Sequence, residues 1–486
     1  MKLFLISWDG KELGLIDAAL KLKENSHEIV YWTYFRDESI DKSKFPKTVF
    51  HNVFDALAGK PADGIDTLDF LPPGEDLLKQ FYETESVILT MMHKKFEWSP
   101  IEQRKHFYHH FLQYWYGVIK KLKPDAIIYS SIPHTVYDFV IYDLARKLGI
   151  KIIIFEDILI ANGWVIVMND YKAGSADLIK QIKENAYSRF SLADLNPDTR
   201  AHYKSQTENG GDKSPLYLKE DLVRYRGLSQ FLIKLRSLWT TLTVLKEISV
   251  LWKALTYLPR QFGPNLKKEH LSVQSAPDFG KKYVYVTLQY QPEAQTCPQA
   301  GVFSDQILMV ETLASVLPEG WLVYVKEHRI VWLRRGLNYY DCRYKGYYRE
   351  IAKLKNVRLV PIETDSFQLI RHSQAVATGA GTVGWEAILR GKPALIFGYP
   401  WYQHSEGVFK IKDAASCREA LEKIKNGFKV SQEKIINFLT CLDRVSLQAY
   451  FHPYIQRTSL SKISVRQNSE NIAGAIEAEL KKLNAG

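Results

Sequence analysis

A glycine-rich segment from Thr378 to Glu386 has the composition of a turn that binds phosphate. It follows a short apolar stretch and is predicted to open a helix, whose unpaired N–H groups would face a ligand. Glycines let the backbone approach that ligand closely, and the Glu386 carboxylate could accept hydrogen bonds from ribose hydroxyls. A turn whose glycines only permit tight packing is the alternative. The residues predicted to bind a nucleotide here are Thr378, Gly379, Gly381, Thr382, Gly384 and Glu386.

Three side chains that can carry positive charge follow another predicted strand, at Lys326, His328 and Arg329. Their charge and hydrogen-bond donors suit a diphosphate or a nucleoside monophosphate leaving group. With a helix N-terminus, such cations can stabilise a departing phosphate without a metal ion. Because the predicted site loops hold no Asp-x-Asp pair, we expect no obligatory divalent metal ion. No other cofactor is expected.

Transfer of a group away from such a phosphate also needs a side chain that takes a proton or traps the reacting carbon. The catalytic candidates are carboxylates that follow predicted strands or open helices, namely Asp138, Glu156, Asp157 and Glu293. Helix capping or a structural role in a loop is an equal alternative for each of them. On the acceptor side, His134 and Gln291 are the candidates.

Alternating strands and helices must position these residues. Strands are predicted at 2–8, 28–34, 124–130 and 151–155 in the first half, and at 283–288, 321–326, 357–360, 375–377 and 394–397 in the second. Strands separated by helices indicate parallel sheets with helices on their faces, an α/β fold. Ligands bind beyond the carboxyl ends of such strands. The polar loops of the second half are therefore expected to meet at one edge of a sheet.

A chain of 486 residues is too long for one ordinary core, so two domains facing a cleft are expected. We predict an acceptor-side domain at 1–200 and a nucleotide-sugar-binding domain at 281–440. A basic amphipathic helical linker is predicted at 201–280, and a helical tail that crosses back to the first domain at 441–486.

The net charge of +11 is concentrated in residues 222–268, which hold nine Lys or Arg and a single acidic residue, Glu247. Leucines and tryptophans recur in this stretch at mostly helical spacing. A basic helix with such an apolar face can lie on an anionic membrane. It can equally pack on the protein core with its basic face in water. The chain has no recognisable nucleic-acid module, so no nucleic-acid partner is expected.

The four cysteines, Cys297, Cys342, Cys417 and Cys441, lie far apart and suggest no disulfide framework. That spacing fits a reducing cytosol. The N-terminal apolar run is too short for a signal peptide, and no apolar stretch reaches the ~20 residues of a membrane span. We therefore expect a cytoplasmic protein, with peripheral attachment to the inner face of the membrane as the alternative.

An ordered set of motifs in residues 283–425 resembles the capsule polysaccharide biosynthesis family. The set comprises Tyr290-Gln291-Pro292-Glu293, Gly301-Val302-Phe303-Ser304-Asp305-Gln306, Tyr324-Val325-Lys326-Glu327-His328, Gly381-Thr382-Val383-Gly384-Trp385-Glu386 and Gly391-Lys392-Pro393. The first half resembles the family only loosely, through Pro133-His134 and Phe155-Glu156-Asp157.

The resemblance implies a glycosyltransferase with two Rossmann-like domains (GT-B-like) and the donor nucleotide in the C-terminal domain. The family includes transferases of Kdo from CMP-Kdo in capsule and lipopolysaccharide assembly, which makes CMP-Kdo the first expected donor. His328 falls where the family has a His-Pro donor-site motif, and Arg329 departs from it by replacing the proline.

Two other functions remain open from the sequence. A non-catalytic component could bind a glycan or lipid acceptor of polysaccharide assembly and export without binding nucleotides. A nucleotide-sugar epimerase could share the architecture, although a soluble substrate gives no reason for a basic amphipathic stretch. The intact glycine-rich turn with Glu386 favours the transferase over the non-catalytic component.

Overall fold

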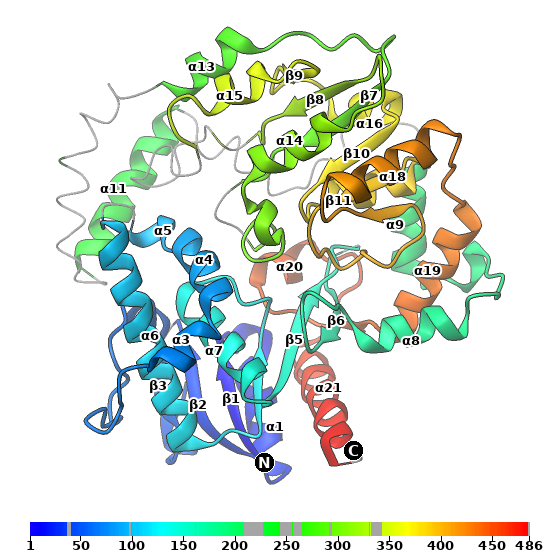
Figure 1. Ribbon diagram of the computed structural model, residues 1–486. Coiled ribbons are helices and arrows are strands. Elements are labelled where there is room, and N and C mark those ends of the chain that lie inside the picture. Colours follow the sequence, from blue (N-terminus) through cyan, green and yellow to red (C-terminus); the bar gives the residue numbers. More distant parts are fainter. Residues whose placement is uncertain are drawn as a thin grey trace.

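The computed structural model describes residues 1–35, 40–96, 99–160, 162–208, 227–243, 255, 265–290, 294–329, 331 and 343–484. Within these ranges the chain forms a seven-stranded and a six-stranded sheet, each with helices packed on its faces (Figure 1). The prediction of an α/β fold with two mostly parallel sheets is confirmed.

The first sheet has the strand order β13-β6-β5-β4-β1-β2-β3. The strands from β1 to β5 pair in parallel, whereas β6 and β13 join antiparallel. The prediction did not include these antiparallel strands. Because β6 follows β5 after a short loop, it needs no crossover helix and folds back as a hairpin. The strands are β1 (Lys2–Ile6), β2 (Glu28–Tyr34), β3 (Val49–Asn52), β4 (Ala126–Tyr129), β5 (Lys151–Asp157), β6 (Trp164–Met168) and β13 (Leu447–Gln448).

Alternation along the strands divides the core of this sheet between its two faces. Phe4 and Ile6 pack with one group of helices, and Leu3 and Leu5 pack with α1 and with α21 from the end of the chain. The helices on the first face are α2 (Val53–Leu57), α4 (Tyr82–Met91), α6 (Ile101–Leu122) and α7 (Val136–Lys147); those on the second are α1 (Leu15–Glu24) and α21 (Val465–Asn484).

The second sheet has the order β12-β11-β10-β7-β8-β9, and all its pairs are parallel. Chain order runs outward from β7 to β9 and then returns to β10 on the other side of β7. This reversal is the place where open α/β sheets bind ligands. The strands are β7 (Tyr283–Thr287), β8 (Leu322–Lys326), β9 (Val357–Val360), β10 (Ala375–Thr378), β11 (Ala394–Ile396) and β12 (Val408–Lys410).

Helices α13, α14, α15 and α18 cover one face of the second sheet, and α16 and α17 cover the other. Their bounds are α13 (Leu266–Val273), α14 (Gln306–Ser315), α15 (Tyr347–Lys353), α16 (Ser366–His372), α17 (Val383–Leu389) and α18 (Ala414–Lys425). The remaining described helices are α3 (Glu75–Lys79), α5 (His93–Phe96), α8 (Ala176–Glu184), α9 (Pro197–Thr207), α11 (Gly227–Thr243), α19 (Gln432–Val445) and α20 (Pro453–Thr458).

Helix α11 lies within the basic stretch and exposes large apolar side chains. Leu232, Leu235 and Trp239 are 63%, 48% and 66% exposed. Their spacing of three and four residues places them on one face of the helix. Among the described residues, none of the helices combines the length and the apolar content that crossing a bilayer requires.

Candidate functional site

The glycine-rich turn lies at the carboxyl end of β10, beside the end of β7. The Thr378 hydroxyl accepts a hydrogen bond from the Gly381 N–H at 3.2 Å, and the Tyr402 hydroxyl donates to the Gly381 carbonyl. The following helix, α17, is only seven residues long. It starts after Thr382, whose side chain makes no capping hydrogen bond. So short a helix contributes little dipole, and the neighbouring cations must supply most of the attraction for a phosphate.

At three of the glycines in this turn, a side chain would crowd other side chains of the protein. A Cβ at Gly379 would lie 2.7 Å from Gln289 Oε1, and one at Gly381 would lie 2.5 Å from Gln289 Nε2. A Cβ at Gly384 would lie 2.3 Å from the Tyr402 hydroxyl. The tight-packing explanation therefore accounts for these glycines, whether or not a ligand also needs them.

Gln289 was not among the predicted site residues. Its backbone N–H donates to Gln306 Oε1 at 2.6 Å, and its side-chain Oε1 accepts from the Ala380 N–H at 3.3 Å. Its buried Nε2 has no hydrogen-bond partner among the described residues. The sequence signal that could have identified it was its position directly after β7, since residues at the carboxyl ends of central strands face the ligand.

Lys326, the last residue of β8, is buried and donates a hydrogen bond from Nζ to Ser366 Oγ at 2.7 Å. Burial, reinforced by the charge of Arg329, lowers the pKa of Lys326 from 10.5 to about 7. Burial also raises the pKa of Glu386 from 4.5 to about 7, against the opposing charges of Arg390 and Lys326. Two groups with perturbed pKa values beside the glycine-rich turn are typical of a functional site.

The loop after β8 is anchored by a buried ion pair. Arg343 Nε lies 2.9 Å from Glu327 Oε2, both side chains are at most 1% exposed, and Arg343 Nη2 also donates to the Gln289 carbonyl at 3.0 Å. The Tyr348 hydroxyl donates to Glu327 at 2.8 Å. Although burial favours the neutral acid, Arg343 holds the pKa of Glu327 below its usual value. This pair therefore joins the loop ends of β7 and β8.

His328 and Arg329 follow directly and are half-buried. The His328 N–H donates to Glu327 Oε1 at 2.7 Å, and the His328 ring lies 6.4 Å from the Tyr290 ring. Arg329 is close enough to Lys326 to lower its pKa. The structure thus brings the three predicted cationic residues to the sheet edge that carries Glu386.

The candidates of the first half lie at the carboxyl edge of the other sheet. Glu156 is the second-to-last residue of β5 and accepts a hydrogen bond from Gln299 Nε2 at 3.5 Å, which links the two halves of the chain. Burial, with the charge of Asp157, raises the pKa of Glu156 to about 8. Burial raises the pKa of Asp157 to about 6, although the Leu159 N–H donates to it at 3.0 Å.

Asp138 and His134 differ in their roles near the start of α7. Asp138 is buried and accepts a hydrogen bond from the Thr135 N–H at 2.8 Å, which caps the helix. His134 is exposed, and its Nδ1 lies 2.7 Å from the Ile132 carbonyl. Because a carbonyl only accepts, Nδ1 carries the proton and Nε2 of the neutral ring is left as an acceptor. His134 is therefore better placed than Asp138 to take a proton from a ligand.

The two other predicted residues, Gln291 and Glu293, lie outside the described residues. Within the described ranges, the structure places no three His, Cys, Asp or Glu side chains close enough together to hold a metal ion.

The unusual protonation of Glu156 leads to a prediction about stability. With a pKa of about 8 when folded and 4.5 when unfolded, Glu156 holds a proton in the native state that the unfolded chain releases. The contribution of Glu156 to the free energy of unfolding is therefore lost as the pH rises from about 4.5 to 8. Glu156→Gln should match the wild type near pH 4.5 and exceed it at pH 8, by on the order of 2–5 kcal/mol.

Melting temperatures measured between pH 4.5 and 8.5 would check this expectation. Glu12→Gln changes an exposed carboxylate and serves as the control. A difference between Glu156→Gln and the wild type that does not grow with pH would show that Glu156 is ionised in the native state.

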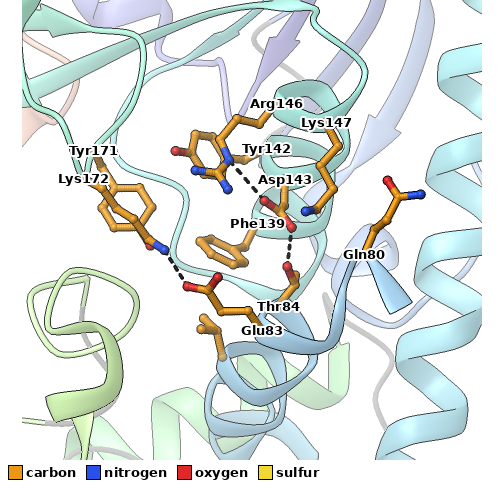
Figure 2. A pocket seen from close by; sticks show the side chains of 11 residues that line it. Gln80, Glu83, Thr84, Phe139, Tyr142, Asp143, Arg146, Lys147, Tyr171 and Lys172 are labelled. Carbon is orange, nitrogen blue, oxygen red and sulfur yellow. Dashed lines mark hydrogen bonds and ion pairs between the residues drawn. The ribbon is translucent and has the colours of Figure 1, made fainter. Parts of the chain in front are cut away.

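A separate hollow that opens to solvent lies in the first half between α4, α7 and the loop after β6 (Figure 2). Both of its carboxylates have ion-pair partners among its side chains. Lys172 Nζ lies 2.6 Å from Glu83 Oε1, Arg146 Nε lies 3.4 Å from Asp143 Oδ1, and the Thr84 hydroxyl donates to Asp143. This hollow contains none of the predicted site residues.

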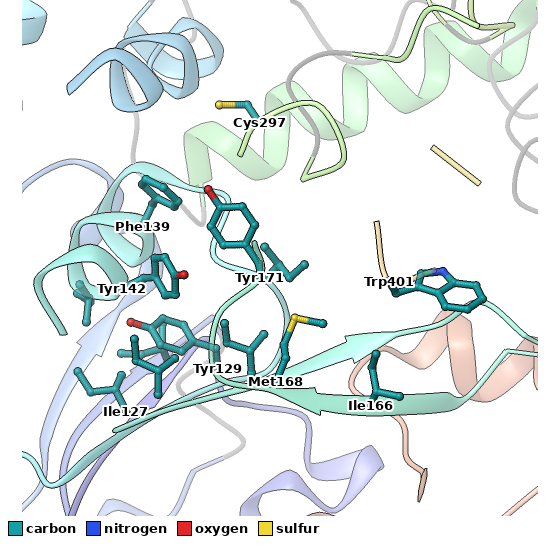
Figure 3. Packing of buried hydrophobic residues seen from close by; sticks show 14 of the residues in the cluster. Ile127, Tyr129, Phe139, Tyr142, Ile166, Met168, Tyr171, Cys297 and Trp401 are labelled. Atoms are coloured by element: carbon teal, nitrogen blue, oxygen red, sulfur yellow. The ribbon is translucent and has the colours of Figure 1, made fainter. Parts of the chain in front are cut away.

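The two halves also share one apolar cluster (Figure 3). Cys297 and Trp401 of the second half are buried in the same cluster as Tyr171 of the first half. Tyr171 packs edge-to-face on Tyr399 at 6.1 Å, and His404 Nε2 lies 2.9 Å from the Ala173 carbonyl. These contacts position the loop after β11 against the first domain.

Comparison with solved structures finds only remote similarity. The chain covers 89% of the Thermosulfurimonas dismutans KpsC β-Kdo 2,7-transferase domain over 75% of its own length, with 12% identity and a TM-score of 0.31. It covers 98% of a UDP-GlcNAc 2-epimerase from Methanocaldococcus jannaschii over 92% of its own length, with 11% identity and a TM-score of 0.25. Similarities at this level do not distinguish a transferase from an epimerase. No curated protein sequence matches the chain significantly.

The sequence profile of one family matches residues 263–438, a segment that includes β7 to β12, the glycine-rich turn, Lys326 and Glu386. That family is described as capsule polysaccharide biosynthesis protein. The match covers more than a third of the chain and coincides with the second sheet. Residues 263–438 therefore belong to the capsule polysaccharide biosynthesis family.

Proposed function

We propose that the protein is a glycosyltransferase that moves a sugar from a nucleotide-activated donor to a capsule or lipopolysaccharide glycan. The observation that carries the proposal is that buried Lys326 and half-buried Glu386 lie near enough to shift each other's pKa beside the glycine-rich turn, at the reversal point of a parallel sheet. CMP-Kdo is the proposed donor, because the family includes transferases that use it.

In this mechanism the cations act on the leaving group. Lys326 and Arg329 stabilise the departing phosphate, and its negative charge in turn favours the protonated form of Lys326. His328 and the backbone of the turn at Gly379 complete the donor site. The carboxylate of Glu386 accepts hydrogen bonds from the ribose hydroxyls. The proposed mechanism contains no step in which a metal ion takes part.

The acceptor side is proposed to lie on the first sheet. His134 Nε2 takes the proton of the attacking hydroxyl, as the tautomer held by the Ile132 carbonyl allows. Asp157, which sits at the junction with the second half and whose pKa of about 6 leaves it ionised at pH 7, stabilises the positive charge that develops on the sugar. Glu156, which is protonated at that pH, donates a hydrogen bond there. Asp138 acts through the helix that it caps, by positioning His134.

Attachment to the inner face of the membrane is part of the proposal. The exposed stripe of Leu232, Leu235 and Trp239 on α11 lies in the strongly basic stretch and suits an anionic lipid surface. Co-sedimentation with phosphatidylglycerol vesicles, but not with phosphatidylcholine vesicles, would support this attachment. Equal binding to both, or to neither, would contradict it.

Nucleotide binding tests the central claim. A thermal-shift screen with CMP, UMP, UDP, GDP and dTDP should identify one nucleotide that stabilises the folded protein. The expected stabilisation is about 2.7 kcal/mol at a hundredfold excess over the dissociation constant. Glu386→Ala should lose the shift, because ribose recognition is removed.

Lys392→Met is the control for general effects of substitution in this domain. Lys392 precedes β11 at the opposite edge of the same sheet and donates to the Ser373 carbonyl at 2.8 Å. The Lys392→Met variant should show the full rise in melting temperature with the nucleotide. If the wild type shows no shift with any nucleotide, the transferase proposal is wrong, and the non-catalytic acceptor-binding role replaces it.

A further inference from the structure

Two phenylalanine rings are exposed at the carboxyl edge of the first sheet. Phe35 follows β2 and is 43% exposed, and Phe54 follows β3 in the first turn of α2 and is 42% exposed. Their centroids lie 6.2 Å apart with the planes at 79°. The two exposed rings together offer an apolar, aromatic surface to another molecule.

Asp9 lies beside these rings on a firmly held turn. Its Oδ2 accepts a hydrogen bond from the Phe35 N–H at 3.1 Å. The turn that carries it begins at Ser7, which has a left-handed φ of 53° and whose N–H donates to Thr33 Oγ1 at 2.6 Å. The next residue, Trp8, is fully buried. A strained turn that is fixed from both sides presents the Asp9 carboxylate in one position.

Two imidazoles, those of His452 and His134, lie farther along the same edge of the first sheet, toward the junction of the two halves. His452 is exposed at the start of α20 and lies near enough to Asp9 and to His134 for both to influence its pKa. Glu156 and Asp157 follow at the end of β5. Both imidazoles and carboxylates form hydrogen bonds with hydroxyl groups.

The sheet order arranges these groups in a line. The adjacent strands β5, β4, β1, β2 and β3 carry, respectively, the Glu156–Asp157 pair, His134, Asp9, Phe35 and Phe54 near their carboxyl ends. Four strand intervals of about 4.8 Å give this strip a length of roughly 19 Å. Its polar end lies at Glu156, which contacts the second half through Gln299, and its aromatic end lies farthest from that contact.

We propose that this strip binds an oligosaccharide, with internal sugar rings stacked on Phe35 and Phe54 and the reacting end beside His134. A sugar ring has an apolar face of C–H groups and a rim of hydroxyls, and the strip offers aromatic rings for the first and Asp9 for the second. The inference rests on the proposed transferase function, and it makes the acceptor a glycan of several units. A single sugar would leave the aromatic end of the strip uncovered.

Calorimetric titration of the full-length protein with two probes tests the inference. The probes are the core oligosaccharide of lipopolysaccharide and a Kdo oligosaccharide. The variants are Phe35→Ala/Phe54→Ala, Phe54→Leu, which keeps an apolar side chain without a ring, and Phe279→Ala. Phe279 has a similar exposure of 39% but lies next to His372 in the second domain.

At least one probe should bind the wild type, and the double variant should bind it at least tenfold more weakly, which is about 1.4 kcal/mol. Phe54→Leu should weaken binding to a smaller but measurable extent, and Phe279→Ala should not change it. Wild-type affinity in the double variant or in Phe54→Leu would overturn the inference, and so would a wild type that binds neither probe.

The nucleotide thermal shift separates this inference from the proposed function. All three variants should keep the wild-type shift, because the rings lie on the first sheet and the glycine-rich turn on the second. If nucleotides raise the melting temperature normally but neither oligosaccharide binds, only the proposed oligosaccharide site is wrong. If an oligosaccharide binds but no nucleotide raises the melting temperature, the oligosaccharide site is supported and the transferase proposal is wrong.

Discussion

Arg343→Ala is expected to lower the free energy of unfolding by about 3–5 kcal/mol, since it leaves the Glu327 carboxylate buried without its cation. Both side chains of the pair are at most 1% exposed, so water cannot replace the lost partner. The same change removes a donor from the Gln289 carbonyl. Urea denaturation at pH 7 measures the effect directly.

A matched control and a rescue variant make this expectation specific. Lys423→Ala removes one partner of an exposed ion pair with Glu419 and should cost less than about 0.5 kcal/mol. Adding Glu327→Gln to Arg343→Ala should recover part of the loss, because the uncompensated charge disappears. A loss below about 1 kcal/mol in Arg343→Ala would mean that Glu327 finds another partner or takes up a proton.

Lys326→Met should weaken nucleotide binding about 10- to 100-fold, because it removes one charge-assisted hydrogen bond to phosphate. The rate of sugar transfer should fall by about 100- to 1000-fold, as expected when a group that stabilises developing charge is lost. Calorimetry with the nucleotide found by the thermal-shift screen measures the first effect. Release of nucleotide from its sugar conjugate measures the second.

The stability of this variant distinguishes a functional from a structural role. Burial lowers the pKa of Lys326 to about 7, so between pH 7 and 10.5 the unfolded chain holds a proton that the native state lacks. Wild-type stability from this residue therefore rises with pH across that window, and Lys326→Met should abolish the rise. Its melting temperature at pH 7 should not fall, since an apolar side chain replaces a buried amine. If Lys326→Met binds the nucleotide as tightly as the wild type, Lys326 does not contribute to the donor site.

Several features of the fold were predictable because they depend on local pattern. Apolar strands that alternate with helices imply parallel sheets, and the polar residues after β8 and β10 must then lie at a common edge. The glycine-rich turn and the Lys326–Arg329 segment are found there together. Strand β6 was not predicted, although Trp164–Met168 is an apolar run of five residues. Its antiparallel direction could not have been predicted either, because such a run has the same local pattern in both directions.

Roles that depend on the immediate surroundings of one side chain were only partly predictable. Asp138 was equally suited to catalysis and to helix capping, and only its contact with the Thr135 N–H distinguishes the two. The pKa values of Glu156 and Glu386 depend on burial, which the sequence does not specify for a carboxylate at the end of an element.

By itself, the amino-acid sequence determined the α/β class, the two sheets and the family of residues 263–438, because strand periodicity and glycine-rich turns are short-range properties of the chain. Tertiary structure alone decided that Arg343 pairs with Glu327, that Gln289 fills the space left by Gly379 and Gly381, and that Glu156 meets Gln299. Each of these contacts joins residues that lie 16 to 143 positions apart. Such contacts follow from the order of strands in a sheet and from the packing of one domain on the other, and neither is encoded in a local pattern.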